Sequence, residues 1–136
     1  DTPYSGVAAI FRSALERGEP PRVFEDGAQM RDFVHVDDVA AANVRAIAAV
    51  TSGPADSFSP YNVSSGSPIS IADVARLVGA GVPGSPVEPV VTGEFRVGDV
   101  RHIVASPDKA RSELGFDAAV LPADGLRRFA LDPLRG

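Results

Sequence analysis

The sequence predicts an α/β fold made of short strands and about five helices. Three observations support this prediction. Apolar residues recur at helical spacing, and the clearest stripe consists of Val7, Ile10, Phe11, Ala14 and Leu15. Short β-prone runs stand between the helical stretches. The 13 glycines and 12 prolines are spread between these segments, where they mark turns and loops.

Length and composition limit the classes of protein to which the chain can belong. With 136 residues it corresponds to one domain or to a piece of one, and we interpret its start at Asp1 as the sign of a fragment. No stretch has the length and apolarity of a membrane span, so we expect no membrane partner. A net charge of −5 without a basic run disfavours nucleic acid. The absence of cysteine excludes disulfides and suits a cytoplasmic location.

The first part of the chain predicts a helix and a strand. A loop at Thr2–Ser5 leads into the apolar stripe, and Gly18 is expected to end that helix in a left-handed conformation. Pro20 and Pro21 force extended backbone, so the following Val23-Phe24 is predicted to be a short strand.

The segment from Val23 to Val39 is the centre of the sequence. Asp26-Gly27 predicts a turn, Arg31 to Val36 predicts a strand, and Asp37 or Asp38 is expected to cap the next helix. An arginine on a strand beside a helix start can bind a phosphate. A surface ion pair between Arg31 and Asp32 or Asp26 is the alternative, because such pairs are common.

The next helix is predicted over residues 39–50. Nearly every position there is apolar and six are alanine, so we expect the helix to be buried on most sides. Its composition is typical of close packing against other elements.

The second half alternates strands, turns and helices. A strand is expected at Ser59–Val63, and a turn at Ser64–Pro68. Ser70 and Asp73 form a capping box for a helix with Val74 and Val78 on its apolar stripe. The remaining predictions are an extended segment at 87–91, a strand at 101–104, a helix that starts at Ser106-Pro107 and ends at Gly115-Phe116, and a last helix from Pro122, before a frayed tail at 132–136.

Two further motifs differ in how strongly they indicate a binding site. Gly79 to Gly84 fit the pattern G-x-G-x-x-G, but they follow a helix, and Pro83 and Pro86 forbid a helix after them. We therefore reject a dinucleotide site there and expect a loop. The run R-V-G-D places Arg96 and Asp99 in one turn, where they can bind a ligand or pair with each other.

Several motifs together resemble a known family. The run G-A-Q-M-R-D-F-V-H-V-D-D-V-A resembles the G-x-Q-x-R-D-[FY]-[VI]-[HY]-V-x-D segment of the extended short-chain dehydrogenases, the NAD-dependent epimerase/dehydratase family of nucleotide-sugar enzymes. The segments P-Y-S-G-V, Y-N-V-S-S-G, R-V-G-D-V-R-H and S-P-D-K-A-R-S-E-L-G-F are also similar, so the resemblance covers nearly the whole chain. Ser64 stands where the family usually has glycine.

The resemblance implies a set of binding residues for a nucleotide sugar. In the family, the arginine at the position of Arg31 contacts the pyrophosphate, and the strand at Val23 and Phe24 runs along the base. In its 4-epimerases, the arginine matching Arg96 also binds the pyrophosphate, and the aspartate matching Asp99 accepts from a ribose hydroxyl. These residue types suit their roles, because a guanidinium matches phosphate oxygens in pairs.

The resemblance also implies what this chain does not carry. The family's epimerases bind NAD in a Rossmann domain, use a Tyr-x-x-x-Lys pair and form homodimers. The only lysine, Lys109, has alanine four positions before it. We therefore interpret residues 1–136 as the C-terminal nucleotide-sugar-binding lobe without the Rossmann domain, with no catalytic or cofactor-binding residue. We expect it to be inactive alone, marginally stable, and apolar on the face of helix 39–50 that the missing domain covers.

Three functions remain open on this evidence. The preferred hypothesis is part of an NAD-dependent nucleotide-sugar 4-epimerase. The alternatives are part of a sugar-nucleotide 4,6-dehydratase or NAD(P)-dependent reductase, and a stand-alone nucleotide-binding module without catalysis. A metal site from His35, Asp37, Asp38 and His102 is disfavoured, because Asp37 is expected to leave the strand.

Overall fold

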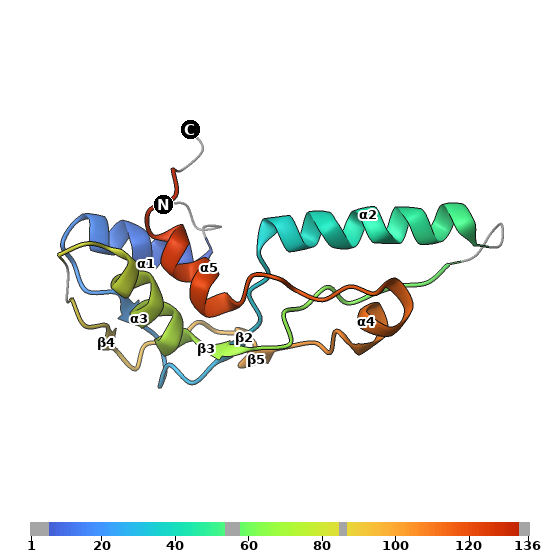
Figure 1. The fold of residues 1–136 in the computed structure, drawn as a ribbon. Helices are drawn as coiled ribbons and strands as arrows, with labels where there is room; N and C mark the ends of the chain where they lie inside the picture. The colour runs from blue at the N-terminus through green and yellow to red at the C-terminus, as the bar shows by residue number, and fades with distance from the viewer. Residues whose placement is uncertain (1–5, 54–57, 85–86, 134–136) are drawn as a thin grey trace.

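The computed structural model describes residues 6–53, 58–84 and 87–133. The predicted loop at 2–5 and the last three residues of the tail lie outside this part. Figure 1 shows two groups of helices along one long axis. One group contains α1 (Val7–Glu16), α3 (Ile71–Gly81) and α5 (Pro122–Phe129), and the other contains α2 (Val36–Ser52) and α4 (Asp108–Leu114). The described residues therefore form five helices, and the predicted α/β class is confirmed.

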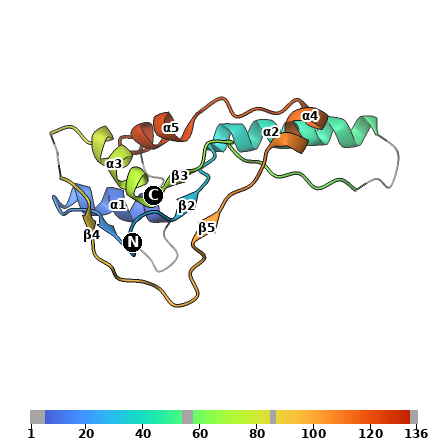
Figure 2. The same cartoon turned by 90° about the horizontal axis from the view of Figure 1, so that it is seen from below.

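Five very short strands connect the helices in two small sheets. The first pairs β1 (Arg22–Val23) with β4 (Val90–Val91) in parallel. In the second, β2 (Met30–Arg31) lies between β3 (Ile69–Ser70), which is antiparallel to it, and β5 (His102–Ile103), which is parallel. Figure 2 shows that the chain between β4 and β5 forms a wide loop before it returns to β2.

The larger core lies between α1, α3 and α5. Phe11 and Leu15 from α1 pack with Val74 and Val78 from α3 and Leu126 from α5. The burial of Phe11 and Leu15 confirms the predicted apolar stripe of the first helix. The predicted cap of α3 is also confirmed, because Ser70 Oγ accepts from Asp73 N at 3.1 Å. The buried Arg12 ties α1 to the end of α5 by donating to Phe129 O at 2.7 Å and to Asp132 O at 2.6 Å.

A smaller core joins α2 to α4. It contains the buried residues Ala42, Ala110 and Phe116. Gly115 has φ 61°, and Phe116 N donates to Ala110 O at 3.2 Å. The predicted end of this helix is therefore confirmed, while its start lies one residue later than expected, at Asp108. Ser106 still caps it, because its Oγ accepts from Asp108 N at 3.1 Å.

The predicted boundary between strand and helix after Arg31 was wrong. The strand ends at Arg31 and α2 begins at Val36. His35, not Asp37 or Asp38, caps α2, because its Nδ1 accepts from Asp37 N at 3.2 Å. The buried Asp38 carboxylate instead accepts from Ala119 N and Val120 N at 2.9 and 3.0 Å, and so holds the segment before α5.

The burial expected for the alanine-rich helix was also wrong within this chain. Only Asp38 and Ala42 of α2 are buried, whereas Val44, Ile47 and Val50 are 64–67 % exposed. These exposed residues share one helix face, because they follow each other at intervals of three. The expectation that this chain exposes an apolar face on the helix is thus confirmed. None of the described helices is long and apolar enough to span a membrane.

Two other predictions required correction. Residues 59–63 form no strand, since none of the described segments pairs with them. Gly79 and Gly81 belong to the last turn of α3 and not to a loop. A Cβ at Gly81 would lie 2.6 Å from Ala130 Cβ, so this glycine allows α5 to pack closely on α3.

Candidate functional site

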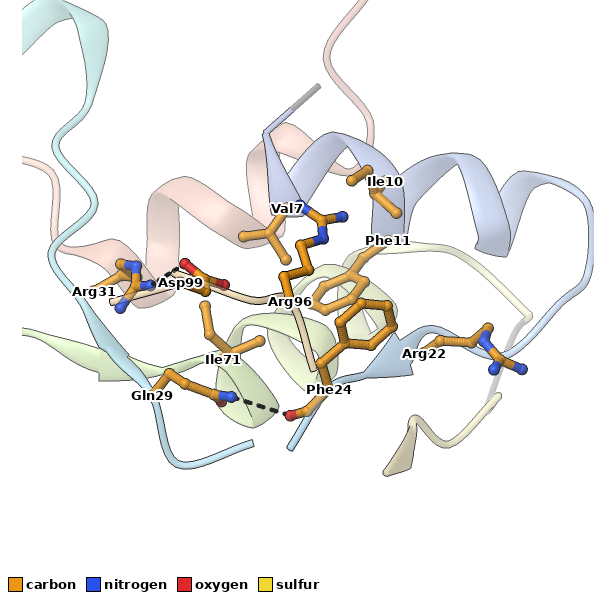
Figure 3. Close-up of a pocket in the computed structure, with 10 residues that line it drawn as sticks. All are labelled: Val7, Ile10, Phe11, Arg22, Phe24, Gln29, Arg31, Ile71, Arg96 and Asp99. Atoms are coloured by element: carbon orange, nitrogen blue, oxygen red, sulfur yellow. Dashed lines mark hydrogen bonds and ion pairs between the residues drawn. The ribbon is translucent and has the colours of Figure 1, made fainter. Parts of the chain in front are cut away.

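A pocket of about 290 Å³ lies where the loop before β5 meets β1, β2 and the starts of α1 and α3. Its lining combines five apolar side chains, two of them phenylalanines, with three arginines, one aspartate and one glutamine. These residues, drawn in Figure 3, are Val7, Ile10, Phe11, Ile71, Arg22, Arg31, Arg96, Asp99, Gln29 and Phe24. Four of the five residues predicted for the site, Arg31, Arg96, Asp99 and Phe24, therefore line one pocket.

Arg96 extends across the pocket, and its guanidinium has no charged partner among the described residues. Its guanidinium lies 5.5 Å from the centroid of the Phe24 ring, and Figure 3 shows it extending toward Val7 of α1. Within the described part of the chain it forms no hydrogen bond or ion pair, and the alternative of an Arg96–Asp99 pair is not observed. Its donors are free to bind an anion.

Arg31 has many partners. Its Nη1 donates to Met30 O at 2.8 Å and to Arg101 O at 2.9 Å, and its Nη2 donates to Val100 O at 2.6 Å. Nη2 also lies 3.6 Å from Asp99 Oδ1. Arg31 thus holds the chain that enters β5 and sets the position of Asp99 at the pocket edge.

The aspartates considered as partners of Arg31 have other contacts. The Asp26 carboxylate binds Arg101, with Oδ2 2.7 Å from Nη2. The Asp32 carboxylate accepts from the backbone and side chain of Ser65. Neither ion pair considered for Arg31 is therefore formed. Its carboxylate neighbour is instead Asp99, which lies far away in the sequence.

The two residues predicted to run along a base differ in position. The Phe24 side chain faces the pocket, as Figure 3 shows. Val23 is fully buried in the core, does not line the pocket, and its carbonyl accepts from Thr92 N at 2.9 Å. The structure therefore assigns Val23 a packing contact and leaves the Phe24 ring available to a ligand.

Gln29 lines the pocket although sequence reasoning gave it no role. The residue is 6 % exposed, and its Nε2 donates to Phe24 O at 3.2 Å. Its Oε1 is buried without a hydrogen-bond partner among the described residues. An unsatisfied buried oxygen is costly, and a donor supplied by a ligand would satisfy it. The sequence signal was present, because Gln29 occupies the glutamine position of the G-x-Q-x-R-D motif, two residues before Arg31.

The single lysine and a tyrosine meet outside the pocket. Lys109 Nζ lies 4.8 Å from the centroid of the Tyr61 ring and donates to Pro60 O at 3.0 Å. The Tyr61 hydroxyl donates to Glu113 Oε2 at 2.9 Å. Because neither residue lines the pocket, this pair cannot act as acid or base there. No group of three or more described His, Asp or Glu side chains could hold a metal.

The described residues do not fit a dinucleotide cofactor. Such a site needs a glycine-rich turn between a strand and a helix start that attracts phosphate. Among the described residues, the helices that follow a strand are α2, α3 and α4. Each carries carboxylates in its first turn: Asp37 and Asp38 in α2, Asp73 in α3 and Asp108 in α4. Carboxylates at these positions repel a pyrophosphate.

Comparison with known proteins identifies the family. Residues 1–64 match the profile of the NAD dependent epimerase/dehydratase family. The chain is 40 % identical over 114 residues to dTDP-L-rhamnose 4-epimerase from Burkholderia thailandensis, which covers 83 % of this chain and 30 % of that protein. It is 38 % identical over 127 residues to UDP-glucose 4-epimerase from Mycolicibacterium smegmatis, covering 91 % and 37 %. The chain belongs to the NAD-dependent epimerase/dehydratase family.

Solved structures of this family share the fold. UDP-N-acetylglucosamine 4-epimerase from Methanobrevibacter ruminantium, in complex with UDP-N-acetylmuramic acid, has a TM-score of 0.77 and 26 % identity over 96 % of this chain and 39 % of its own. UDP-glucose 4-epimerase from Thermotoga maritima, with UDP-glucose, has a TM-score of 0.74 and 32 % identity over 95 % and 40 %. The chain thus spans roughly a third of the length of the epimerase/dehydratase relatives that it matches.

Proposed function

We propose that this chain is the nucleotide-sugar-binding portion of an NAD-dependent nucleotide-sugar 4-epimerase. The observation that carries the proposal is the meeting of Arg31, Arg96, Asp99 and Phe24 in one pocket. These residues come from two segments about 70 positions apart in the sequence, and both segments belong to motifs that resemble the family. The 4-epimerases matched over 83 % and 91 % of this chain support the same function.

The pocket supplies the contacts that a nucleoside diphosphate needs. Arg96 offers a free guanidinium, which binds phosphate oxygens in pairs. Asp99 offers a half-exposed carboxylate that can accept from a ribose hydroxyl. The ring of Phe24 and the apolar residues of α1 offer a surface for the base.

The size of the pocket indicates that it binds part of the substrate. Its volume of about 290 Å³ lies just below the range of roughly 300–1,000 Å³ for small-molecule sites. In the proposed function, the sugar therefore extends beyond this lobe toward a second unit that holds NAD and the catalytic residues. That unit is also the proposed partner of the exposed face of α2, and the intact enzyme is proposed to be a homodimer.

Titration calorimetry on the purified chain tests this proposal. UDP and dTDP should bind to the chain. The affinity for each nucleotide sugar should be no lower than the affinity for its nucleoside diphosphate, because the diphosphate that both ligands share makes the main contacts. NAD should show no binding, and the chain alone should not interconvert UDP-glucose and UDP-galactose. Tight binding of NAD, or absence of binding by both UDP and dTDP at millimolar concentration, contradicts the proposal.

The intact enzyme distinguishes the remaining alternatives. A 4-epimerase yields the C4 epimer, whereas a 4,6-dehydratase yields a 4-keto-6-deoxy sugar and a reductase consumes reduced cofactor. Incubation of the intact enzyme with UDP- and dTDP-sugars, followed by NMR of the products, separates these activities and identifies the base.

A further inference from the structure

The segment from Glu94 to Arg101 forms one wall of the pocket but makes few contacts with the core. Phe95 and Val97 are 70 % and 94 % exposed, and Arg96 and Asp99 are also exposed. Loops with little buried apolar surface open easily. The position of Arg96 and Asp99 over the pocket therefore depends on the polar contacts that hold this segment.

Arg101 makes two of these contacts with the turn after β1. Its Nη1 lies 3.0 Å from Glu25 Oε2, and its Nη2 lies 2.7 Å from Asp26 Oδ2. Asp26 is itself fixed, because its other oxygen accepts from Ala28 N at 3.0 Å. The hydrogen bond from Arg101 lowers the pKa of Asp26 to about 2, so the contact favours the charged form of this carboxylate.

The backbone of the same turn is arranged for these contacts. Glu25 has φ 52°, an uncommon conformation for a residue other than glycine. In this conformation its N–H donates to Glu94 O at 2.7 Å while its carboxylate binds Arg101. Residues persist in this region of φ only where their surroundings hold them there. Both ends of the segment are thus bound to the same turn.

Arg31 completes the arrangement from the opposite direction. It belongs to β2 and donates to Val100 O and Arg101 O, whereas Arg101 belongs to the segment and binds Glu25 and Asp26. The segment before β5 is therefore held on one side by Arg31 of β2 and on the other by the turn after β1, which Arg101 binds. Between these contacts lies the turn in which Asp99 N donates to Arg96 O at 3.2 Å.

We propose that Arg101 is a positioning residue for the ligand pocket. By binding Glu25 and Asp26, Arg101 holds the Arg96–Asp99 turn over the pocket. The inference rests on the proposed function, since the ligand it assists is the nucleoside diphosphate. Arg101 does not line the pocket and touches no ligand itself. Because its side chain is 47 % exposed, its ion pairs add little to the stability of the fold, and their effect is on the position of the segment.

Amide hydrogen exchange tests the positioning without any ligand. In Arg101→Ala, the amides of residues 96–100 should exchange at least several times faster than in the wild type, with Asp99 as the most informative probe. Arg101→Lys should be intermediate, because an ammonium group cannot bind both carboxylates in the same way. Arg127→Ala is the matched control, since Arg127 is 52 % exposed and pairs with Asp124 on α5.

Calorimetry with UDP and dTDP measures the consequence for binding. Arg101→Ala should raise the dissociation constant about three- to tenfold. Asp26→Asn should raise the dissociation constant less in the Arg101→Ala variant than in the wild type, because the two residues act as one contact. Unchanged exchange at 96–100 overturns the proposal, and so does faster exchange with unchanged affinity. If exchange increases but the wild type binds neither nucleotide, the proposed function fails while the contact between the segments stands.

Discussion

Replacement of Arg96 by alanine is the sharpest test of the pocket. The guanidinium has no polar partner in the described structure, so its removal leaves no buried group unsatisfied and breaks only the contact with the Phe24 ring. That contact contributes about 0.5–1 kcal/mol at an exposed site, so Arg96→Ala should alter the melting temperature little.

The effect on ligand binding should be much larger. A charge-assisted hydrogen bond to phosphate contributes on the order of 1.5–3 kcal/mol, which corresponds to a loss of about ten- to a hundredfold in affinity for UDP or dTDP. Arg96→Lys should recover little of this loss, because lysine lacks the paired donors. Binding should also weaken as salt concentration rises, since the site is exposed.

Calorimetric titration of wild type, Arg96→Ala and the control Arg127→Ala provides the assay. We expect the control to bind as the wild type does, because Arg127 lies on α5 and pairs with Asp124 away from the pocket. An affinity of Arg96→Ala within twofold of the wild type would refute the proposal that Arg96 binds the phosphates.

Three further predictions concern the fold, the turn and the pocket. Gly81→Ala should destabilise the protein by about 1–3 kcal/mol in chemical denaturation, because its Cβ would collide with Ala130, whereas Gly79→Ala, with open space around it, should be neutral or stabilising. The pKa of Asp26 in the folded state lies below its unfolded value of 3.8, so the charged carboxylate stabilises the fold above about pH 4. This stabilisation should be lost as pH falls through about 2. The difference in melting temperature between wild type and Asp26→Asn should therefore shrink over that range. Gln29→Leu should change the free energy of unfolding by less than about 1 kcal/mol, because Phe24 O keeps its hydrogen bond from Gly27 N. The same variant should bind UDP more weakly in calorimetry. Equal losses of unfolding free energy and of binding free energy would indicate a purely structural role.

The local patterns predicted most helices correctly. The stripe with Phe11, the cap at Ser70 and the left-handed Gly115 depend on residues within a few positions of each other, so short-range geometry determines them. The strands were less predictable. Arg31 to Val36 has the composition of a strand, but only its first residue has partners, Ile69 and Ile103, so the strand ends there.

The candidate site was predicted in part, for the same physical reason. Resemblance identified Arg31, Arg96, Asp99 and Phe24, which line one pocket. The partners of Arg31 in the segment before β5 lie about 70 residues away, and no local pattern specifies such contacts. The roles inferred for Gln29 and Arg101 depend equally on the folded chain.

The separation of the two cores has a consequence for how the protein unfolds. The core beside the pocket draws its buried residues from three helices and β1, whereas the core between α2 and α4 contains three buried residues. Regions with little buried apolar surface open at a lower free-energy cost than the rest of a protein. The α2–α4 end should therefore open first on heating, as a separate cooperative unit, while the helices around the pocket remain folded and able to retain a nucleotide.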